Sequence, residues 1–389
     1  MGRRAKGSGS IFQRSNGYFV ARYEGKDIYG KTKLEVSDKL DTYKAELKAG
    51  GSVAKDITIA QAMPKWLAHK ALTIKPSSFD RLEETVNKHI IPTIGTVKCC
   101  DFTDDIFVTK VIKPMMAKGL SYSSIKKTQD VICPFCKWAC APGRRYMAFD
   151  PMASFEKIKK FAVEKSNDEE EETADTVVYI EKEGRERFKA ACRAKLGNGK
   201  PRFKYGEHFI FCMYTGLRMG ELLALTWDNV DLEKKRIRVD SAVYLVKDRD
   251  PKSKTFGKKV LVVNKYTKNN KPRPIPLGNV AYEAIQNILA EKGESKYVTH
   301  NKDGGLVLAS VFSSMLERVY DLASITIQEG TNVHALRHTF ASMCFEAGMN
   351  VRVISELLGH SSVQITMDIY IHLITDKNLE SIPELKDLQ

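Results

Sequence analysis

The first fifty residues alternate between hydrophobic and polar side chains in short runs. The stretch SIFQRSNGYFVARYEGKDIYG, within residues 8–31, is divided by the turn signals SNG and EGK into runs typical of β-strands. The TKLE sequence that follows predicts a helix whose capping box joins Thr32, at the N-cap, to Glu35. We therefore predict a three-stranded sheet with one helix, ending near Gly50.

Residues 56–155 change to the spacing of amphipathic helices. The stretch ITIAQAMPKWLAHKAL repeats its apolar residues as a helix with one buried face requires. Pro64 and Pro92 are expected to interrupt this helical region. Further helices are predicted around residues 79–90, 104–118 and 121–140.

An acidic stretch, VEKSNDEEEETADT, occupies residues 163–176 and is typical of a linker between domains. From about residue 177 the pattern mixes helices with β runs, KRIRVDSAVYLV and KKVLVVNKYTKNNKPRPIPL. The predicted fold class is a multidomain, mainly α protein with small β-sheets (α+β). Its parts are the N-terminal module at 1–52, a helical domain at 56–162, the linker, and a mixed α/β domain at 177–389.

The chain carries an excess of positive charge. Its 62 Lys and Arg residues against 48 Asp and Glu give a formal net charge of +14. Such an excess favours a polyanionic partner, most often nucleic acid. In the N-terminal module, the arginines interleaved with Tyr and Phe suit a sheet that reads a DNA groove, and we expect four of them to bind DNA: Arg3, Arg4, Arg14 and Arg22.

Location follows from what the sequence lacks. Neither a signal sequence nor a run of about 18 apolar residues is present, so we expect no membrane span and a cytoplasmic protein. The eight cysteines are expected to be reduced thiols.

A phosphate-loop pattern, Gly-x4-Gly-Lys-Thr, occurs in GKDIYGKT at residues 25–32. Such a loop needs a parallel sheet around it. The short segment before it and the helical region after it offer no such sheet, and Thr32 is already assigned to a helix cap. ATP binding is therefore not expected.

Two patterns resemble parts of metal sites. Cys133 and Cys136 in CPFC, followed by Cys140, resemble half a zinc site whose second pair of ligands is missing. On a helix these cysteines share one face, which predicts a buried apolar stripe. His334 and His338 have the spacing of a zinc-protease helix, but the residue after the first histidine is Ala and not the required Glu. No metal site is expected.

Two groups of cations stand in apolar surroundings. In TGLRMGELLALTW, Arg218 follows a Thr-Gly break at the start of an apolar helix, and Glu221 lies one turn further on, where it can hold the guanidinium. In NVHALRHTF, His334 and Arg337 share a face, so we expect this arginine at the rim of a packed helix. One such arginine is typical of a structural ion pair, but two in a chain of charge +14 indicate an anion site.

Three further segments place polar residues at defined positions. In VISELLGHSS a helix is predicted to end at Gly359, so that His360 follows its C-cap. VQITMDIYIHL predicts another short helix, which carries Tyr370. In YTKNNKPRPIPL the Asn-Asn pair is a turn signal between two β runs, which puts Lys268 at the tip of a hairpin.

These fragments together resemble the active-site set of the tyrosine recombinases, the phage integrase family. The resemblance is strong over residues 177–375, and the helical region before the linker is similar to the family's core-binding domain. Residues 1–52 resemble the arm-type DNA-binding domain of integrases from phages and conjugative transposons. CPFCKWACAPGRR departs from the family, since Pro134 is expected to kink or start a helix that is usually continuous. Six residues occur in the family's order: Arg218, Lys268, His334, Arg337, His360 and Tyr370.

The resemblance implies DNA strand cleavage without ATP or any other cofactor. The phenol of Tyr370 would attack a phosphodiester and leave a 3′-phosphotyrosine and a free 5′-hydroxyl. Arg218 and Arg337 would hold the non-bridging oxygens. His334 and His360 would add donors, with His334 the better candidate for proton transfer with the nucleophile. Lys268 would protonate the departing oxygen. Glu221 would support the arginine, and His338 and His372 would pack or face solvent.

The resemblance also implies partners and a cellular setting. The substrate would be double-stranded DNA attachment sites, bound by a homotetramer that exchanges C-terminal tails in a bacterial nucleoid. An excision (directionality) factor and a host DNA-bending protein are optional further partners. Three other functions remain open: a type IB topoisomerase, an Xer-like chromosome-dimer resolvase, and a DNA-binding regulator without catalytic activity. The arm-like module argues against the first two, and the complete six-residue set against the third.

Overall fold

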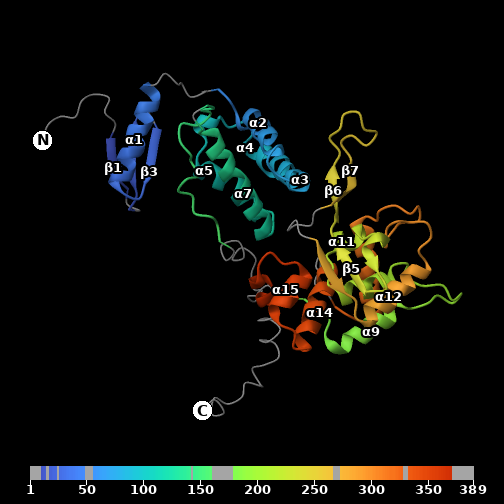
Figure 1. Ribbon diagram of the computed structural model, residues 1–389. Helices are drawn as coiled ribbons and strands as arrows, with labels where there is room; N and C mark the ends of the chain where they lie inside the picture. The colour runs from blue at the N-terminus through green and yellow to red at the C-terminus, as the bar shows by residue number, and fades with distance from the viewer. Residues whose placement is uncertain are drawn as a thin grey trace, which may run out of the picture. The chain divides into compact units, whose positions relative to one another are not determined.

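The protein divides into two compact units, Met1–Glu171 and Glu172–Gln389, which are treated separately (Figure 1). The computed structural model describes residues 10–14, 17–23, 26–48, 56–141, 143–159, 178–265, 272–326 and 332–369. No helix in these ranges is long and apolar enough to cross a membrane. Described residues are mostly helical, with three small antiparallel sheets, which confirms the predicted α+β class.

The first unit begins with the predicted three-stranded sheet, in the antiparallel order β1-β2-β3, followed by one helix. Ala21 and Ile28 of the sheet and Val36 and Leu40 of the helix form a small core. The elements are β1 (Ser10–Gln13), β2 (Phe19–Tyr23), β3 (Lys26–Gly30) and α1 (Lys33–Lys48).

The cap of α1 differs slightly from the predicted box. Thr32 Oγ1 accepts a hydrogen bond from the backbone N–H of Glu35 at 3.2 Å, as predicted. The carboxylate of Glu35 accepts from the N–H of Lys31 at 2.8 Å, one residue before the N-cap. The helix start is therefore capped as expected, with the carboxylate reaching one residue further back.

A bundle of helices makes up the rest of the first unit. Its core contains Trp66 and Phe135, whose rings pack edge to face with centroids 5.9 Å apart. Two π-helical turns each lie directly before a short helix with a proline in its first turn, where a missing N–H breaks the regular ladder. The elements are α2 (Ile59–Ala71), α3 (Pro76–Thr85), η1 (Val86–Ile90), α4 (Ile91–Ile94), η2 (Cys99–Asp101), α5 (Asp104–Phe107), η3 (Val108–Ile112), α6 (Lys113–Ala117) and α7 (Tyr122–Ala139).

Two prolines lie inside helices of this bundle. Pro64 does not interrupt α2, which contradicts the expectation, and Pro134 lies inside α7, which continues to Ala139, so it does not start a helix. An interior proline costs a helix about 3 kcal/mol. Burial of one large apolar side chain returns about 1.5–3 kcal/mol, and α7 buries several on one face, so tertiary packing outweighs the local penalty.

The cysteines of α7 lie on this packed face, as predicted. Cys136 is fully buried in the core of the bundle, and Cys133 and Cys140 pack against the same core while partly buried. Burial raises the pKa of the Cys136 thiol well above its ordinary value. The apolar-stripe interpretation is therefore confirmed.

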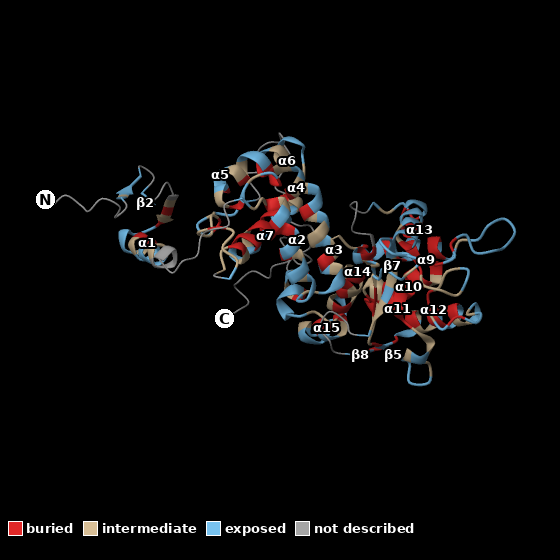
Figure 2. Cartoon of the chain, turned by 90° about the horizontal axis from the view of Figure 1, so that it is seen from above, coloured by how far each residue is buried: buried red, intermediate tan, exposed pale blue. Residues whose placement is uncertain are grey.

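The second unit is built around α10 (Gly206–Thr215), in which every residue except Glu207 and Tyr214 is buried (Figure 2). A helix that is apolar on all sides must be surrounded by other elements, and α10 packs against α9, α12 and α14. The helices around it are α9 (Lys182–Cys192), α11 (Met219–Ala224), α12 (Asn279–Ala290), α13 (Ala309–Leu322), α14 (Asn332–Glu346) and α15 (Val351–Leu358).

Two separate sheets lie beside these helices, and they correct the predicted hairpin at Lys268. β7 pairs with β6, and β8 pairs with β5, so β7 and β8 are not partners. Pro274 and Pro276 explain why β8 has only one partner strand. Prolines lack a backbone N–H, and because these two alternate along β8, the strand has hydrogen-bond donors on one edge only. Lys268 itself lies outside the described residues. The strands are β4 (Val230–Asp231), β5 (Arg236–Val239), β6 (Ala242–Lys247), β7 (Lys259–Asn264) and β8 (Arg273–Pro276).

Candidate active site

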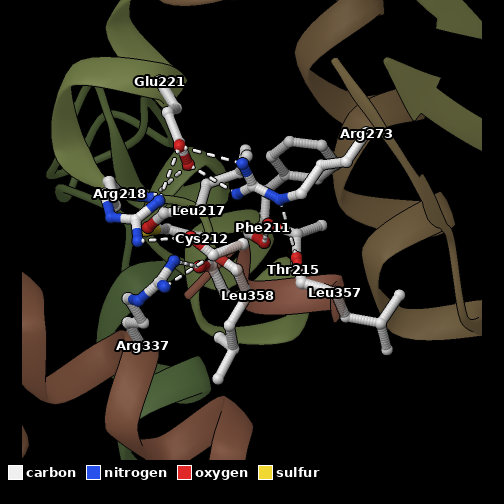
Figure 3. A network of polar contacts seen from close by, with 12 residues as sticks. Phe211, Cys212, Thr215, Leu217, Arg218, Glu221, Arg273, Arg337, Leu357 and Leu358 are labelled. Carbon is white, nitrogen blue, oxygen red and sulfur yellow. Dashed lines mark hydrogen bonds and ion pairs between the residues drawn. The ribbon is translucent and has the colours of Figure 1, made fainter. Parts of the chain in front are cut away.

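Arg218 stands at a break between two helices. α10 ends at Thr215, and Gly216 takes the left-handed conformation (φ 65°) that terminates a helix. Two residues later, Arg218 is the N-cap residue of α11, with an extended backbone. The break is the one predicted from the Thr-Gly pair, and it directs Arg218 toward the polar groups drawn in Figure 3.

Glu221 is a buried carboxylate that binds two arginines (Figure 3). Its Oε1 accepts hydrogen bonds from Nη1 of Arg218 and Nη1 of Arg273, both at 3.0 Å. Its Oε2 accepts from the backbone N–H of Arg218 at 3.0 Å and from Nη2 of Arg273 at 2.7 Å. Burial alone would raise the pKa of Glu221, but the hydrogen bonds and charge of Arg273, and then Arg218, lower it. The predicted contact between Glu221 and Arg218 is present.

Arg273 is a residue that the motifs did not single out. It begins β8, in KPRPIPL, two residues before the buried Ile275. Positions two apart on a strand face the same way, so an arginine there points toward the interior and needs a carboxylate. The two-residue spacing between Arg273 and Ile275 could have predicted a buried arginine. It could not identify its partner as Glu221, which lies more than fifty residues away in the sequence.

The C-terminal end of α15 gathers three arginines from three different elements. The carbonyl of Leu357 accepts from Nε of Arg273 at 2.8 Å. The carbonyl of Leu358 accepts from Nη2 of Arg337 at 2.6 Å, and the carbonyl of Gly359 accepts from Nη2 of Arg218 at 2.8 Å. The last carbonyls of a helix have no partner within it and form the negative end of its dipole. We call Arg218, Arg273 and Arg337, with Glu221, the arginine cluster.

Gly359 is required at this helix end for two reasons. Its backbone is left-handed (φ 64°), and a Cβ here would lie 2.9 Å from Nη1 of Arg273. The N–H of Gly359 bonds to the carbonyl of Glu356, and that of His360 bonds to the carbonyl of Ser355 at 3.0 Å. This Schellman-type turn confirms the predicted C-cap and fixes the backbone of His360 beside the cluster.

Arg337 is buried more deeply than its predicted place at a helix rim. Only 5% of it is exposed, and besides Leu358 it donates to the carbonyl of Gly216 at 2.7 Å. Burial, and then the charge of Arg218, lower the pKa of Arg337 to about 9, so it remains charged at neutral pH. The cluster thus holds three guanidinium groups against one carboxylate. A buried excess of positive charge is stabilised by an anion.

Three histidines surround the cluster. His334 lies at the surface, and partial burial, followed by the charges of Arg337 and Arg218, lowers its pKa. Burial, then Arg337 and Arg218, lower the pKa of His360 to about 3. Burial and His334 lower the pKa of His338 to about 4, and its Nδ1 is buried without a hydrogen-bond partner in the described residues. The rings of His338 and His360 are therefore neutral at pH 7.

The structure brings together four of the predicted residues: Arg218, Glu221, Arg337 and His360, with His334 close enough for its pKa to respond to both arginines. Residues 363–369 are helical, as predicted, and lead up to Tyr370. Tyr370, Lys268, His372, Arg3 and Arg4 lie outside the described residues.

The two described arginines of the N-terminal sheet share one carboxylate. Arg22 binds Asp27 through two bonds, of 2.6 and 2.9 Å, and Arg14 approaches the same side chain at 3.4 Å. Both guanidinium groups also lie over aromatic rings, Arg14 over Tyr29 and Arg22 over Phe12. One positive charge of the pair is left without compensation by Asp27.

Comparisons with known proteins identify the family to which the chain is similar. Residues 189–377 match the model of the phage integrase family, and residues 58–116 match the phage integrase N-terminal SAM-like domain. The chain is 27% identical over 377 residues to a tyrosine recombinase XerC-like protein of Caldanaerobacter subterraneus subsp. tengcongensis, covering 93% of this chain and 92% of that protein.

Two solved structures have a similar fold. One is the Tn1549 transposon integrase in complex with transposon right end DNA, with 19% identity, a TM-score of 0.62, and coverage of 85% of this chain and 99% of that one. The other is a lambda integrase tetramer bound to a Holliday junction, with 14% identity, a TM-score of 0.53, and coverage of 94% and 96%. The fold is that of a multidomain integrase. The chain belongs to the phage integrase family, the tyrosine recombinases.

We expect Glu221→Ala to lower the free energy of unfolding by about 3–5 kcal/mol, because it leaves two arginines without their buried counter-ion. Denaturant unfolding followed by circular dichroism measures this. Glu356→Ala is the matched control, since its 3.6 Å pair with Arg352 is exposed and should contribute about 0.5 kcal/mol or less. Equal losses in the two variants would contradict the account of the cluster.

The pKa of His360 should rise when an anion binds. The pKa of His360 is about 3 in the folded protein and 6.5 when unperturbed. The free energy of unfolding is therefore undiminished by this ring above pH 6.5, and it decreases as the pH falls from 6.5 toward 3. Sulfate would offset the charges of Arg337 and Arg218, so an NMR titration should show a higher pKa. His208, whose pKa of about 4 comes mainly from burial, is the control and should not change. An unchanged His360 would contradict an anion site here.

Proposed function

We propose that this protein is an integrase, a site-specific recombinase that inserts and excises a mobile element by cutting and rejoining DNA. The observation that carries the proposal is the arginine cluster, with three guanidinium groups and one carboxylate held at the end of α15. Membership of the tyrosine recombinase family supports the same reaction. The reaction class is DNA strand transfer through a 3′-phosphotyrosine, without ATP.

In this proposal Arg218 and Arg337 bind the scissile phosphate. Each guanidinium uses some of its N–H groups on backbone carbonyls, which fixes its plane, and retains others for a ligand. The five-coordinate transition state gathers negative charge on the non-bridging oxygens, and guanidinium groups match those oxygens in geometry. Preorganised donors of this kind contribute about 3–4 kcal/mol each.

The histidines supply further donors. His360 is neutral in the free protein and has one N–H to offer a phosphate oxygen. His334 lies at the surface one helical turn before Arg337, where it could exchange a proton with the nucleophile. Both roles need an imidazole ring that is held in position and whose protonation responds to the bound phosphate.

Tyr370 and Lys268 complete the proposed reaction. The Tyr370 oxygen attacks phosphorus while the bond to the 5′-oxygen breaks, and Lys268 donates the proton that the departing oxygen takes up. A phenol has an unperturbed pKa of about 10, so neighbouring cations or a base must assist it. The covalent link conserves the energy of the phosphodiester, and the 5′-hydroxyl of a partner strand later reverses the step.

The parts of the chain before the linker would bind DNA. We assign residues 1–52 to an arm-type domain that uses Arg3, Arg4, Arg14 and Arg22, and residues 56–162 to the core-binding domain. An acidic linker at 163–176 would join them to the catalytic domain at 177–389. The similarity to integrases whose solved structures contain transposon right end DNA and a Holliday junction supports duplex DNA as substrate and a tetramer as the active assembly. C-terminal tail exchange, an excision factor, a DNA-bending protein and nucleoid association belong to the same proposal.

An Xer-like resolvase is the second candidate, favoured by the relative of that name that aligns over most of the chain. Deleting residues 1–52 separates the two. An integrase would lose recombination between arm-bearing attachment sites, whereas a resolvase would keep its activity on a short core site. Relaxation of a supercoiled plasmid without any attachment site would instead indicate a type IB topoisomerase.

Tyr370→Phe should bind attachment-site DNA with unchanged affinity and form no covalent adduct, because only the attacking oxygen is removed. A suicide substrate, nicked so that cleavage cannot be reversed, traps the adduct for denaturing electrophoresis. Tyr282→Phe, on α12, keeps the ring that lies under Lys235; it is the control and should form the adduct at the normal rate. Trapping by Tyr370→Phe would show that another residue is the nucleophile.

Arg218→Lys should keep the charge and lose the planar fork, with cleavage slower by about 100-fold or more. Single-turnover cleavage at saturating DNA measures this apart from binding. Arg193→Lys, at an exposed ion pair with Glu207, is the control and should cleave normally. A loss smaller than about threefold would mean that charge alone suffices at Arg218.

A further inference from the structure

Thr366 is a buried hydroxyl that contacts a proposed catalytic histidine. It lies within the helical residues 363–369, four positions before Tyr370 in the sequence. It has no exposed surface, and its Oγ1 lies 2.7 Å from Nδ1 of His360. None of the catalytic roles described above uses this side chain.

The direction of this hydrogen bond follows from counting donors. Among the described residues, His360 is the hydrogen-bond partner of the Thr366 hydroxyl. If His360 Nδ1 carried the proton and donated it, the hydroxyl hydrogen of Thr366 would have no acceptor among the described residues. An unsatisfied buried donor is costly. This cost favours a bond that runs from Thr366 Oγ1 to an unprotonated Nδ1.

The backbone of His360 leaves the ring little freedom to avoid this contact. Its N–H is fixed to the carbonyl of Ser355 in the turn that ends α15. The preceding Gly359 is packed against Arg273 and accepts a bond from Arg218. The ring is therefore held at both its Cα and its Nδ1.

We propose that Thr366 is a positioning residue, which donates to Nδ1 of His360 and so keeps the ring proton on Nε2, the nitrogen left for a phosphate oxygen. The non-bridging oxygens of a phosphodiester only accept hydrogen bonds. The Nε2–H tautomer offers them a donor, whereas the other tautomer would present a lone pair. The identity of the acceptor rests on the proposed function, but the tautomer itself does not.

The tautomer can be measured on the unmodified protein without DNA. Heteronuclear NMR of a histidine-labelled sample, with His360 assigned from a His360→Gln variant, distinguishes the protonated nitrogen from the other. We expect the proton on Nε2 of His360. A proton on Nδ1, or an equal mixture of tautomers, would overturn the proposal. This reading does not depend on whether any Thr366 variant folds.

Substitutions test the consequence for the reaction. Thr366→Val keeps the shape of the side chain and removes its hydroxyl donor. We expect the rate of single-turnover cleavage of a suicide substrate to fall by about 10- to 100-fold, no more than when a catalytic hydrogen-bond donor is itself removed. Thr366→Ser keeps the hydroxyl and should restore the rate to within about threefold. Val and Ser variants with equal rates would overturn the proposal.

A double-mutant cycle separates this role from simple packing. In a His360→Gln background, Thr366→Val should cause no further loss of cleavage, because the ring that Thr366 orients is already absent. Full additivity of the two losses would assign Thr366 to packing and overturn the proposal. If the proposed function failed instead, Tyr370→Phe would still form the adduct while the NMR result for His360 stood.

Discussion

The geometry of the arginine cluster depends on the last carbonyls of α15, at its C-terminal end. Three consecutive residues, Leu357, Leu358 and Gly359, each accept a hydrogen bond from a different arginine. These arginines come from β8, α14 and the start of α11, which lie far apart in the sequence. The last three carbonyls at this helix end thus fix the relative positions of three cations that would otherwise repel one another.

Two negative groups offset the positive charge of the arginine cluster: the carboxylate of Glu221 and the proposed phosphate ligand. Glu221 offsets one charge permanently and holds Arg218 and Arg273 at a fixed separation. The remaining excess is available to a ligand. Burial, and after it the charges of neighbouring arginines, lower the pKa of both Arg337 and His360. His360 directly follows the same helix end, and the helical residues 363–369 lead from it toward Tyr370, the proposed nucleophile.

Local signals predicted much of this site. The glycines at 216 and 359 mark helix ends that the structure contains, and Glu221 meets Arg218 because three residues separate them on one helical turn. Arg273 was missed because its partners, Glu221 and the Leu357 carbonyl, are distant in sequence. The β7–β8 hairpin was wrong for the same reason, since strand pairing is decided by the whole sheet. Pro134 does not start a helix because core packing outweighs its local penalty.

A crystal structure of the protein on an attachment-site duplex tests the central claim most directly. The account predicts that a non-bridging oxygen of the scissile phosphate accepts hydrogen bonds from both Arg218 and Arg337, with these arginines still bound to the end of α15. It also predicts the Tyr370 oxygen in line with the departing 5′-oxygen. A phosphate bound elsewhere, or arginines that leave the α15 carbonyls to reach it, would contradict the account.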